Sequence, residues 1–251
     1  MNIYVCSDIG GRSHMEDTSC LEKNFGGNKN WHFGGVFDGH VGACVSMLAA
    51  EKMPEIFLEK IKSELKPEKS FKKSFLDVSK MADKQYTGCT ALAFFIRDND
   101  IWIANAGDGR MINVRKKEIS QITNDHQANN ESEKARILKL GGEIKGCYIM
   151  RGKEGLMPTR SLGDEYFRPV GIIPDPEVFH RKIRKDTIGF VLATDGLWEA
   201  MTNEAVGEIL KETKTAKEAA ELIKAVYIGI EPRYMLDNMT VMAIKYNLNA
   251  S

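Results

Sequence analysis

The stretch TGCTALAFFIRDNDIWIANAGDGRMINVR, residues 87–115, decides the fold. It contains three runs with β-like composition, at 89–97, 100–104 and 110–115, and no helix-forming segment separates them. Such clustering differs from the strict strand-helix alternation of a doubly wound parallel sheet. It therefore favours antiparallel sheets covered by helices.

The same two kinds of segment continue on both sides of this stretch. Helix-forming residues dominate five further segments with helical periodicity, which are 41–64, 68–84, 131–140, 203–212 and 216–228. Further β-like runs lie at 3–7, 31–37, 143–150, 177–183, 188–193 and 239–246. No internal repeat or Gly/Ser linker marks a boundary. We expect an α+β fold and a single domain over 1–251.

Composition excludes several classes of partner. Lys+Arg and Asp+Glu both number 35, so no global charge favours nucleic acid or an anionic membrane. Two basic runs, at 69–73 and 181–185, have acidic neighbours and are interpreted as solvated surface. Residues 1–12 lack the basic region and the long apolar run typical of a signal peptide, no apolar stretch approaches about 18 residues, and the five cysteines are dispersed. We expect an intracellular monomer, cytoplasmic and/or nuclear, that binds neither nucleic acid nor membrane.

Acidic residues recur where β-like runs end or turn. Asp38 ends the run at 31–37, Asp195 ends the run at 188–193, and Asp237 precedes the run at 239–246. Asp108 lies between two runs, and Glu16-Asp17 adds adjacent carboxylates near the N-terminus. One Asp-Gly pair is ordinarily a turn, but strand ends are rigid platforms that can converge. The repetition predicts a shared acidic site.

Converging carboxylates need cations. Two of them about 4 Å apart repel by roughly 4 kcal/mol at an effective dielectric of about 20. Oxygen ligands suit Mg²⁺ or Mn²⁺, and the five histidines form no zinc motif. Two such ions can activate a water for attack on phosphorus.

Two further residues suit phosphate chemistry. Arg12 has the planar fork that grips phosphate oxygens, and His40 has the imidazole chemistry suited to protonating a leaving alkoxide. The alternative interpretations are a surface arginine and a histidine at a helix start.

A competing hypothesis places a nucleophile at Cys6. Cys6 to Ser13 fits C-x5-R-S, which is similar to the phosphate loop of cysteine-dependent phosphatases, with Cys6 as thiolate and Arg12 as phosphate clamp. Asp8 would place a negative charge inside that loop, however, and the four strand-end aspartates would have no role.

Nine ordered motifs resemble those of the protein phosphatase 2C family, over about residues 7 to 246. They are GRSHMED at 11–17, VFDGHVG at 36–42, TGCTALAFF at 87–95, NAGDGR at 105–110, ITNDHQ at 122–127, TRSLGD at 159–164, PEV at 176–178, LATDGLWE at 192–199 and DNMTV at 237–241. The resemblance implies a central pair of antiparallel sheets flanked by helices, and hydrolysis of phosphoserine or phosphothreonine in proteins.

The resemblance also implies roles for single residues at a centre with two Mg²⁺ or Mn²⁺ ions. Asp38 would bridge the ions, the Gly39 carbonyl would bind one, and Asp195 and Asp237 would hold the other. The remaining implied roles are water ligation by Glu16 and Asp17, phosphate binding by Arg12, acid catalysis by His40 and a weaker third metal at Asp108.

Two departures from the family pattern affect these expectations. Glu199 replaces the usual aspartate at the third metal site, and the segment 165–174, which corresponds to the substrate-facing flap, is short. An inactive, partner-binding relative of such enzymes is the remaining alternative, but it would be expected to have lost metal carboxylates that this chain keeps.

Overall fold

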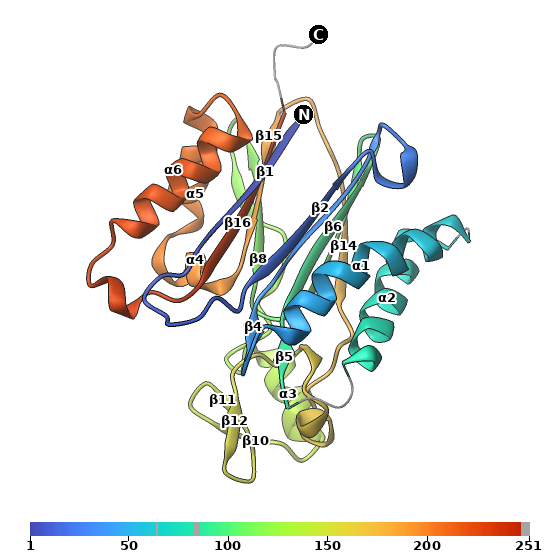
Figure 1. Cartoon of the computed structure of the whole chain (residues 1–251), viewed down its shortest axis with the longest axis vertical. Helices are drawn as coiled ribbons and strands as arrows, with labels where there is room; N and C mark the ends of the chain where they lie inside the picture. The colour runs from blue at the N-terminus through green and yellow to red at the C-terminus, as the bar shows by residue number, and fades with distance from the viewer. Residues whose placement is uncertain (64, 83–85, 247–251) are drawn as a thin grey trace.

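Two five-stranded antiparallel sheets form the centre of the molecule (Figure 1). The computed structural model describes residues 1–63, 65–82 and 86–246. The first sheet has the order β1 (Asn2–Asp8), β16 (Met239–Lys245), β15 (Thr187–Ala193), β8 (Arg110–Arg115) and β9 (Ile119–Gln121). The second has the order β14 (Glu177–Lys182), β7 (Asp100–Ala106), β6 (Ala91–Arg97), β3 (Trp31–Phe37) and β2 (Thr18–Lys23). The predicted α+β class and antiparallel pairing are confirmed.

Both faces of the central strands are buried, which explains why these strands are nearly continuous apolar runs. Along β6, Leu92, Phe94 and Ile96 pack against the other sheet. The alternate residues Ala91, Ala93 and Phe95 pack against helices on the outer face. Successive strand side chains point to opposite faces, so a strand covered on both sides needs apolar residues at every position.

Helices cover the two outer faces, as Figure 1 shows. The second sheet is covered by α1 (Cys44–Lys62) and α2 (Pro67–Met81), with an aromatic cluster that includes Phe33, Phe57 and Phe71. The first sheet is covered by α4 (Asp195–Ala200), α5 (Asn203–Glu212) and α6 (Ala216–Ile228). No helix in the described part of the chain is both long and apolar enough to span a bilayer.

Smaller elements gather at one end of the sandwich, the lower end in Figure 1. A short sheet joins β4 (Gly39–His40), β5 (Gly88–Cys89) and β13 (Leu162–Gly163). A separate meander contains β10 (Glu143–Lys145), β11 (Tyr148–Arg151) and β12 (Glu154–Leu156), beside α3 (Glu131–Lys139) and the 3-10 turn η2 (Glu165–Val170). Two further 3-10 turns are η1 (Phe25–Gly27) and η3 (Arg233–Met235).

Several element boundaries differ from the sequence prediction. The run 143–150 is not one strand but the hairpin of β10 and β11. The strand β2 was missed because its partly exposed residues give no strong apolar pattern, and α4 because its six residues are too few to show helical periodicity. Residues 64 and 84, at the ends of two predicted helices, lie outside the described residues.

Candidate active site

Strand ends bring the predicted acidic residues to one pocket. Asp38 follows β3, Asp108 lies in the turn from β7 to β8, Asp195 follows β15 by two residues, and Asp237 precedes β16 by two. All these strand ends meet at the same end of the sandwich. A pocket of about 480 Å³ is lined there by Arg12, Glu16, Asp38, Gly39, His40, Asp108, Asp195, Glu199 and Asp237.

Crowding changes the protonation of these carboxyls. Loss of hydration, together with the charges of Asp195 and Asp17, raises the pKa of Asp38 well above its ordinary value. Burial and the charge of Asp195 likewise raise the pKa of Asp108. Burial also raises the pKa of Asp195 and of Glu199, and the charge of Asp237 adds to both shifts. These carboxyls therefore favour binding a proton, or a cation in its place, over carrying an unneutralised charge.

Asp17 lies behind the pocket wall and does not line it. Thr194 donates a hydrogen bond of 2.8 Å to Asp17 Oδ2, and burial raises the pKa of Asp17 to about 7. Asp17 Oδ1 and Asp195 Oδ1 are buried and accept no hydrogen bond from the described residues. Buried carboxylate oxygens without donors are costly unless a proton or a cation satisfies them.

The donor set fits a hard divalent cation that keeps part of its water shell. Carboxylate and carbonyl oxygens are the ligands of Mg²⁺ and Mn²⁺, and Mg²⁺ is commonly held by one or two carboxylates plus water. No group of three or more His, Cys, Asp or Glu side chains within residues 1–63, 65–82 and 86–246 is arranged to hold an ion by itself.

The N-terminal loop that carries Glu16 is fixed to the pocket floor. Asn238 Oδ1 accepts from the Glu16 N–H at 2.7 Å, and the Glu16 carbonyl accepts from the Gly39 N–H at 3.2 Å. Glu16 Oε1 accepts from the Gly42 N–H at 2.5 Å. A Cβ at Gly39 would lie 2.7 Å from the Glu16 carbonyl oxygen, so only glycine fits this approach.

Arg12 stands at the mouth of the pocket. Its guanidinium lies 2.6 Å from Asp237 Oδ2, and its side chain is 62% exposed. Such a group can reach an incoming anion without leaving a buried partner unpaired.

His40 has a buried carboxylate partner that the sequence did not identify. His40 Nε2 lies 2.8 Å from Asp164 Oδ2, which also accepts from Ser161 Oγ at 2.5 Å. A Cβ at Gly88 would lie 2.0 Å from Asp164 Oδ2 and 2.6 Å from His40 Nε2, so Gly88 leaves the space that the pair occupies. Asp164 belongs to the motif TRSLGD, which was identified from the sequence. Nothing in the sequence, however, places Asp164 beside His40, which is 124 residues away.

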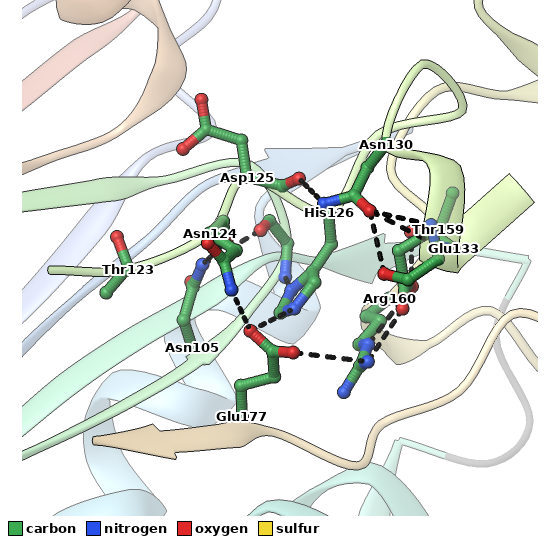
Figure 2. Close-up of polar contacts among 12 residues, drawn as sticks. Asn105, Thr123, Asn124, Asp125, His126, Asn130, Glu133, Thr159, Arg160 and Glu177 are labelled. Carbon is green, nitrogen blue, oxygen red and sulfur yellow. Dashed lines mark hydrogen bonds and ion pairs between the residues drawn. The ribbon is translucent and has the colours of Figure 1, made fainter. Parts of the chain in front are cut away.

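The turn that carries Asp108 rests on a polar network drawn in Figure 2. Asn105 Nδ2 donates to the carbonyls of Gly107, Gly109 and Asn124, at 3.0, 3.1 and 2.9 Å. His126 Nδ1 accepts from the Gly107 N–H at 3.2 Å. Asn105 and His126 thus fix the backbone on both sides of Asp108, and neither was predicted.

The same figure shows an internal ion cluster around Glu133. Arg160 and Arg136 lie 2.7 and 2.6 Å from its carboxylate, and Thr159 Oγ1 donates to it at 2.7 Å. Although burial alone raises the pKa of Glu133, these hydrogen bonds lower it to about 2. The cluster joins α3 to the segment that leads to Asp164.

Cys6 lies outside the pocket, on β1. Its Sγ donates to the Ala220 carbonyl at 3.4 Å, and burial with the charge of Glu221 raises its pKa to about 11. A thiol with a raised pKa is a weak nucleophile at neutral pH. This geometry disfavours the cysteine hypothesis.

The pocket rim differs from the sequence expectation. Tyr148 of β11 and residues 155–158, which include the end of β12, line the pocket, whereas no residue of 165–174 does. The expectation that 165–174 faces the substrate is therefore wrong. Residues 165–170 form η2, and its Phe167 packs in a small core with Ile137 and Ile149, beneath the meander.

Comparison with known proteins identifies the family. The family model described as "Protein phosphatase 2C" matches residues 2–228. This chain belongs to the protein phosphatase 2C family. The rice protein "Probable protein phosphatase 2C 54" is 33% identical, with 97% of this chain and 72% of that protein aligned.

A longer relative agrees with this assignment, and a solved structure shares the fold. The rice "Protein kinase and PP2C-like domain-containing protein" is 32% identical over 94% of this chain, which spans only 38% of that protein. The crystal structure of serine-threonine phosphatase 2C from Toxoplasma gondii superimposes with a TM-score of 0.83 at 20% identity, covering 98% of this chain and 94% of that one. The predicted protein phosphatase 2C-like sandwich is confirmed.

Removing a pocket carboxylate tests the cation site of this phosphatase 2C-family chain without measuring activity. We expect Asp38→Asn protein to melt, without divalent cations, at the same temperature as wild type or higher, because it buries one ionisable group fewer. Mg²⁺ or Mn²⁺ should raise the melting temperature of wild type but not of Asp38→Asn, since binding to the folded state stabilises it. Asp98→Asn, on an exposed turn after β6, is the matched control and should keep the rise. An undiminished rise in Asp38→Asn would remove Asp38 from the site.

Acid titration tests the Glu133 cluster. The folded-state pKa of about 2 lies below the ordinary value of 4.5, so the cluster stabilises the fold above pH 4.5 and loses this contribution as pH falls toward 2. By this linkage the loss at pH 3 is on the order of 2 kcal/mol. Denaturant unfolding of wild type and Glu133→Gln at pH 7 and pH 3 should show the difference between them shrinking at acid pH. A constant difference would contradict the assigned pKa.

Proposed function

We propose that this chain is a metal-dependent protein serine/threonine phosphatase that hydrolyses phosphoserine and phosphothreonine at the pocket. The observation that carries the proposal is the convergence of Asp38, Asp195 and Asp237 beside Arg12 and the His40–Asp164 pair, with donor-free carboxylate oxygens on Asp17 and Asp195. Family membership supports a protein phosphatase. Serine/threonine specificity and metal dependence are the finer part of the proposal.

The proposed centre takes two Mg²⁺ or Mn²⁺ ions, and a weaker third site is proposed beside them. Asp38, the Gly39 carbonyl, Asp195 and Asp237 would hold the ions, and Glu16 and Asp17 would hold waters around them. Asp108 and Glu199 line the same pocket and are proposed for a weaker third ion. When bound, the ions supply an activated water nucleophile and neutralise charge that develops on the phosphoryl group.

The remaining chemistry belongs to side chains of this chain. Arg12 binds phosphate oxygens at the pocket mouth and orients the phosphorus for in-line attack. The His40 imidazolium keeps its Nε2 proton in the hydrogen bond to Asp164 and gives its Nδ1 proton to the departing serine or threonine oxygen. An alkoxide is a poor leaving group, so this proton matters more for phosphoserine than for an aryl phosphate.

Two expectations from the sequence stay predictions: the monomeric state and the intracellular location. The alternative is an inactive binding module, which would be expected to lack some of the ligands. Each proposed ligand is present in this chain, and only Asp17 lies outside the pocket lining.

Phosphopeptide hydrolysis tests the proposed reaction. We expect release of phosphate from phosphoserine and phosphothreonine peptides with Mg²⁺ or Mn²⁺, and almost none after chelation. Asp38→Asn and Asp195→Asn should lower kcat at least about a hundredfold, since electrostatic stabilisation is commonly the largest catalytic contribution. Cys6→Ser should keep most activity. Full activity in excess chelator, or loss with Cys6→Ser alone, would transfer the reaction to the cysteine hypothesis.

Leaving-group dependence tests the His40–Asp164 pair. We expect His40→Ala and Asp164→Asn to lower kcat on phosphoserine peptides by about 10²-fold, and on 4-nitrophenyl phosphate by less than about tenfold, because phenolates leave without a proton. Asn tolerates the left-handed backbone at Asp164, where φ is 50°, so the turn should persist. The double variant should be no slower than His40→Ala. Equal losses on both substrates would show that Asp164 supports the fold and not the proton transfer.

A further inference from the structure

A concave basic surface lies at the end of the sandwich opposite the pocket. The connection from β14 to β15 is at the upper end in Figure 1, whereas β4, β5 and the meander are at the lower end. A cavity of about 600 Å³ lies beside this connection. It is lined by Asn113, Arg115, Glu118, Ser120, His180, Arg181, Lys182, Ile183, Arg184 and Thr187, and we call it the distal groove.

The distal groove collects cations from two turns that are distant in sequence. Arg181, Lys182 and Arg184 come from the end of β14 and the connection after it, and Arg115 comes from the end of β8. The exposed side chains of Lys116, Lys117 and Lys185 adjoin these residues in the chain. The whole chain carries no formal net charge, so this surface is a local excess of positive charge.

Arg115 fastens the two turns together. Its guanidinium lies 2.7 Å from Asp186 and 2.8 Å from Glu118, and the Asp186 carbonyl accepts from the Lys116 N–H at 3.1 Å. Thr187 Oγ1 accepts from the Arg184 N–H at 3.0 Å, which closes the second turn. The two acidic neighbours are therefore used in holding the groove in shape.

The outward cations keep their charge for a ligand. Among the described residues, Arg181 and Lys182 form no ion pair, and both side chains are exposed. His180 is occupied by Asp100 at 2.6 Å and by stacking on Trp102, so it supports the groove and does not extend from it. Keeping like charges close together costs free energy that an anionic ligand would recover.

Shape and composition favour an acidic peptide over other polyanions. None of the exposed large apolar residues of the described chain lines the groove, although such residues normally accompany cations on a membrane-binding surface. The only aromatic ring in the lining, that of His180, is already stacked, which leaves no platform for bases. The groove lies between β9 and β14, the edge strands of the two sheets, where an extended chain can lie.

We propose that the distal groove binds an acidic segment of the phosphoprotein substrate and so tethers the substrate while its phosphoresidue occupies the pocket. The substrate role rests on the proposed phosphatase function, whereas the binding of an acidic peptide does not. β15 runs from the groove at Thr187 toward Asp195 and has seven residues, so the two sites are on the order of 25 Å apart. A tether acts by raising the effective concentration of the phosphoresidue, and only a linker that spans this distance can do so.

Linker length provides the test. Phosphoserine peptides would carry a block of six glutamates after a Gly/Ser spacer of four or twenty residues. A four-residue spacer spans at most about 14 Å, so only the outermost glutamates of the short peptide can reach the groove, whereas a twenty-residue flexible spacer has a mean span of about 25 Å and presents the whole block. We expect the long spacer to lower KM at least about threefold relative to a peptide without glutamates, with kcat unchanged, and the short spacer to give a smaller gain. The decrease in KM given by the long spacer should disappear at high salt, because salt screens the attraction between the glutamates and the groove.

Charge variants locate the effect. Arg181→Glu/Lys182→Glu should abolish the gain from the long spacer and leave hydrolysis of 4-nitrophenyl phosphate unchanged. Lys69→Glu/Lys73→Glu on α2 changes the net charge equally in the other basic run and should keep the gain. If the charge reversal unfolds the protein, Arg181→Gln/Lys182→Gln should still reduce the gain. A gain that is equal in both reversed variants, or independent of spacer length, would overturn the proposal.

Direct binding separates the groove from the reaction. A fluorescein-labelled hexaglutamate peptide without phosphate should bind wild-type and Asp38→Asn protein alike, by anisotropy, and bind Arg181→Glu/Lys182→Glu at least about threefold more weakly. That result would support the groove even if phosphopeptide hydrolysis failed. Tighter binding of single-stranded oligonucleotides or phosphatidylserine vesicles, with no competition from the peptide, would overturn the proposal.

Discussion

Mutual repulsion among carboxylates fixed at strand ends is the constraint on which the functional end of this molecule depends. Asp38, Asp108 and Asp195 lie in the same pocket, and loss of hydration and neighbouring charge raise the pKa of each. On flexible loops, the aspartates would move apart and so relieve this repulsion. Here the aspartates lie directly beside strands that are buried on both faces, so the packing of two sheets and two helical layers holds them together.

A comparison of Glu133 with Asp17 shows how the pocket differs from the rest of the interior. The carboxyl of Asp17 is not more buried, but among the described residues it has no positively charged partner like those of Glu133. Glu133 is as buried as Asp17, yet its pKa falls to about 2, while that of Asp17 rises to about 7. Arg136 and Arg160 neutralise Glu133 from within the chain. The hydrogen bonds to Asp17 come from Thr194, Thr240 and the Asp38 carboxyl, and these stabilise its charge less well than an ion pair does. A cation from solution would complete the pocket in the way that arginine completes the Glu133 cluster.

The sequence predicts what repeats locally and misses what depends on distant neighbours. The antiparallel class followed from three strands in succession at 87–115, and the acidic pocket from aspartates at the ends of such runs. The sequence did not predict the partner of His40, because Asp164 reaches it only through the pairing of β5 with β4 and β13. The roles of Asn105 and His126 were also missed. Both side chains contact the backbone of Gly107 and not a ligand, so their residue types gave no sign of a site. The rim was misplaced to 165–174 because the exposed meander has no apolar pattern that separates a pocket rim from any surface hairpin.

A net charge of zero conceals a separation of charge along the sandwich. Uncompensated carboxylates gather at one end, around Asp38 and Asp195, and uncompensated cations gather at the other, around Arg181 and Lys182. An acidic ligand is repelled by the first end and attracted by the second, so the field of the protein orients it before contact. Bound divalent cations would reverse the local sign at the pocket and leave the distal groove unchanged. A phosphorylated acidic protein would then be attracted at both ends, but only after the pocket had acquired its ions.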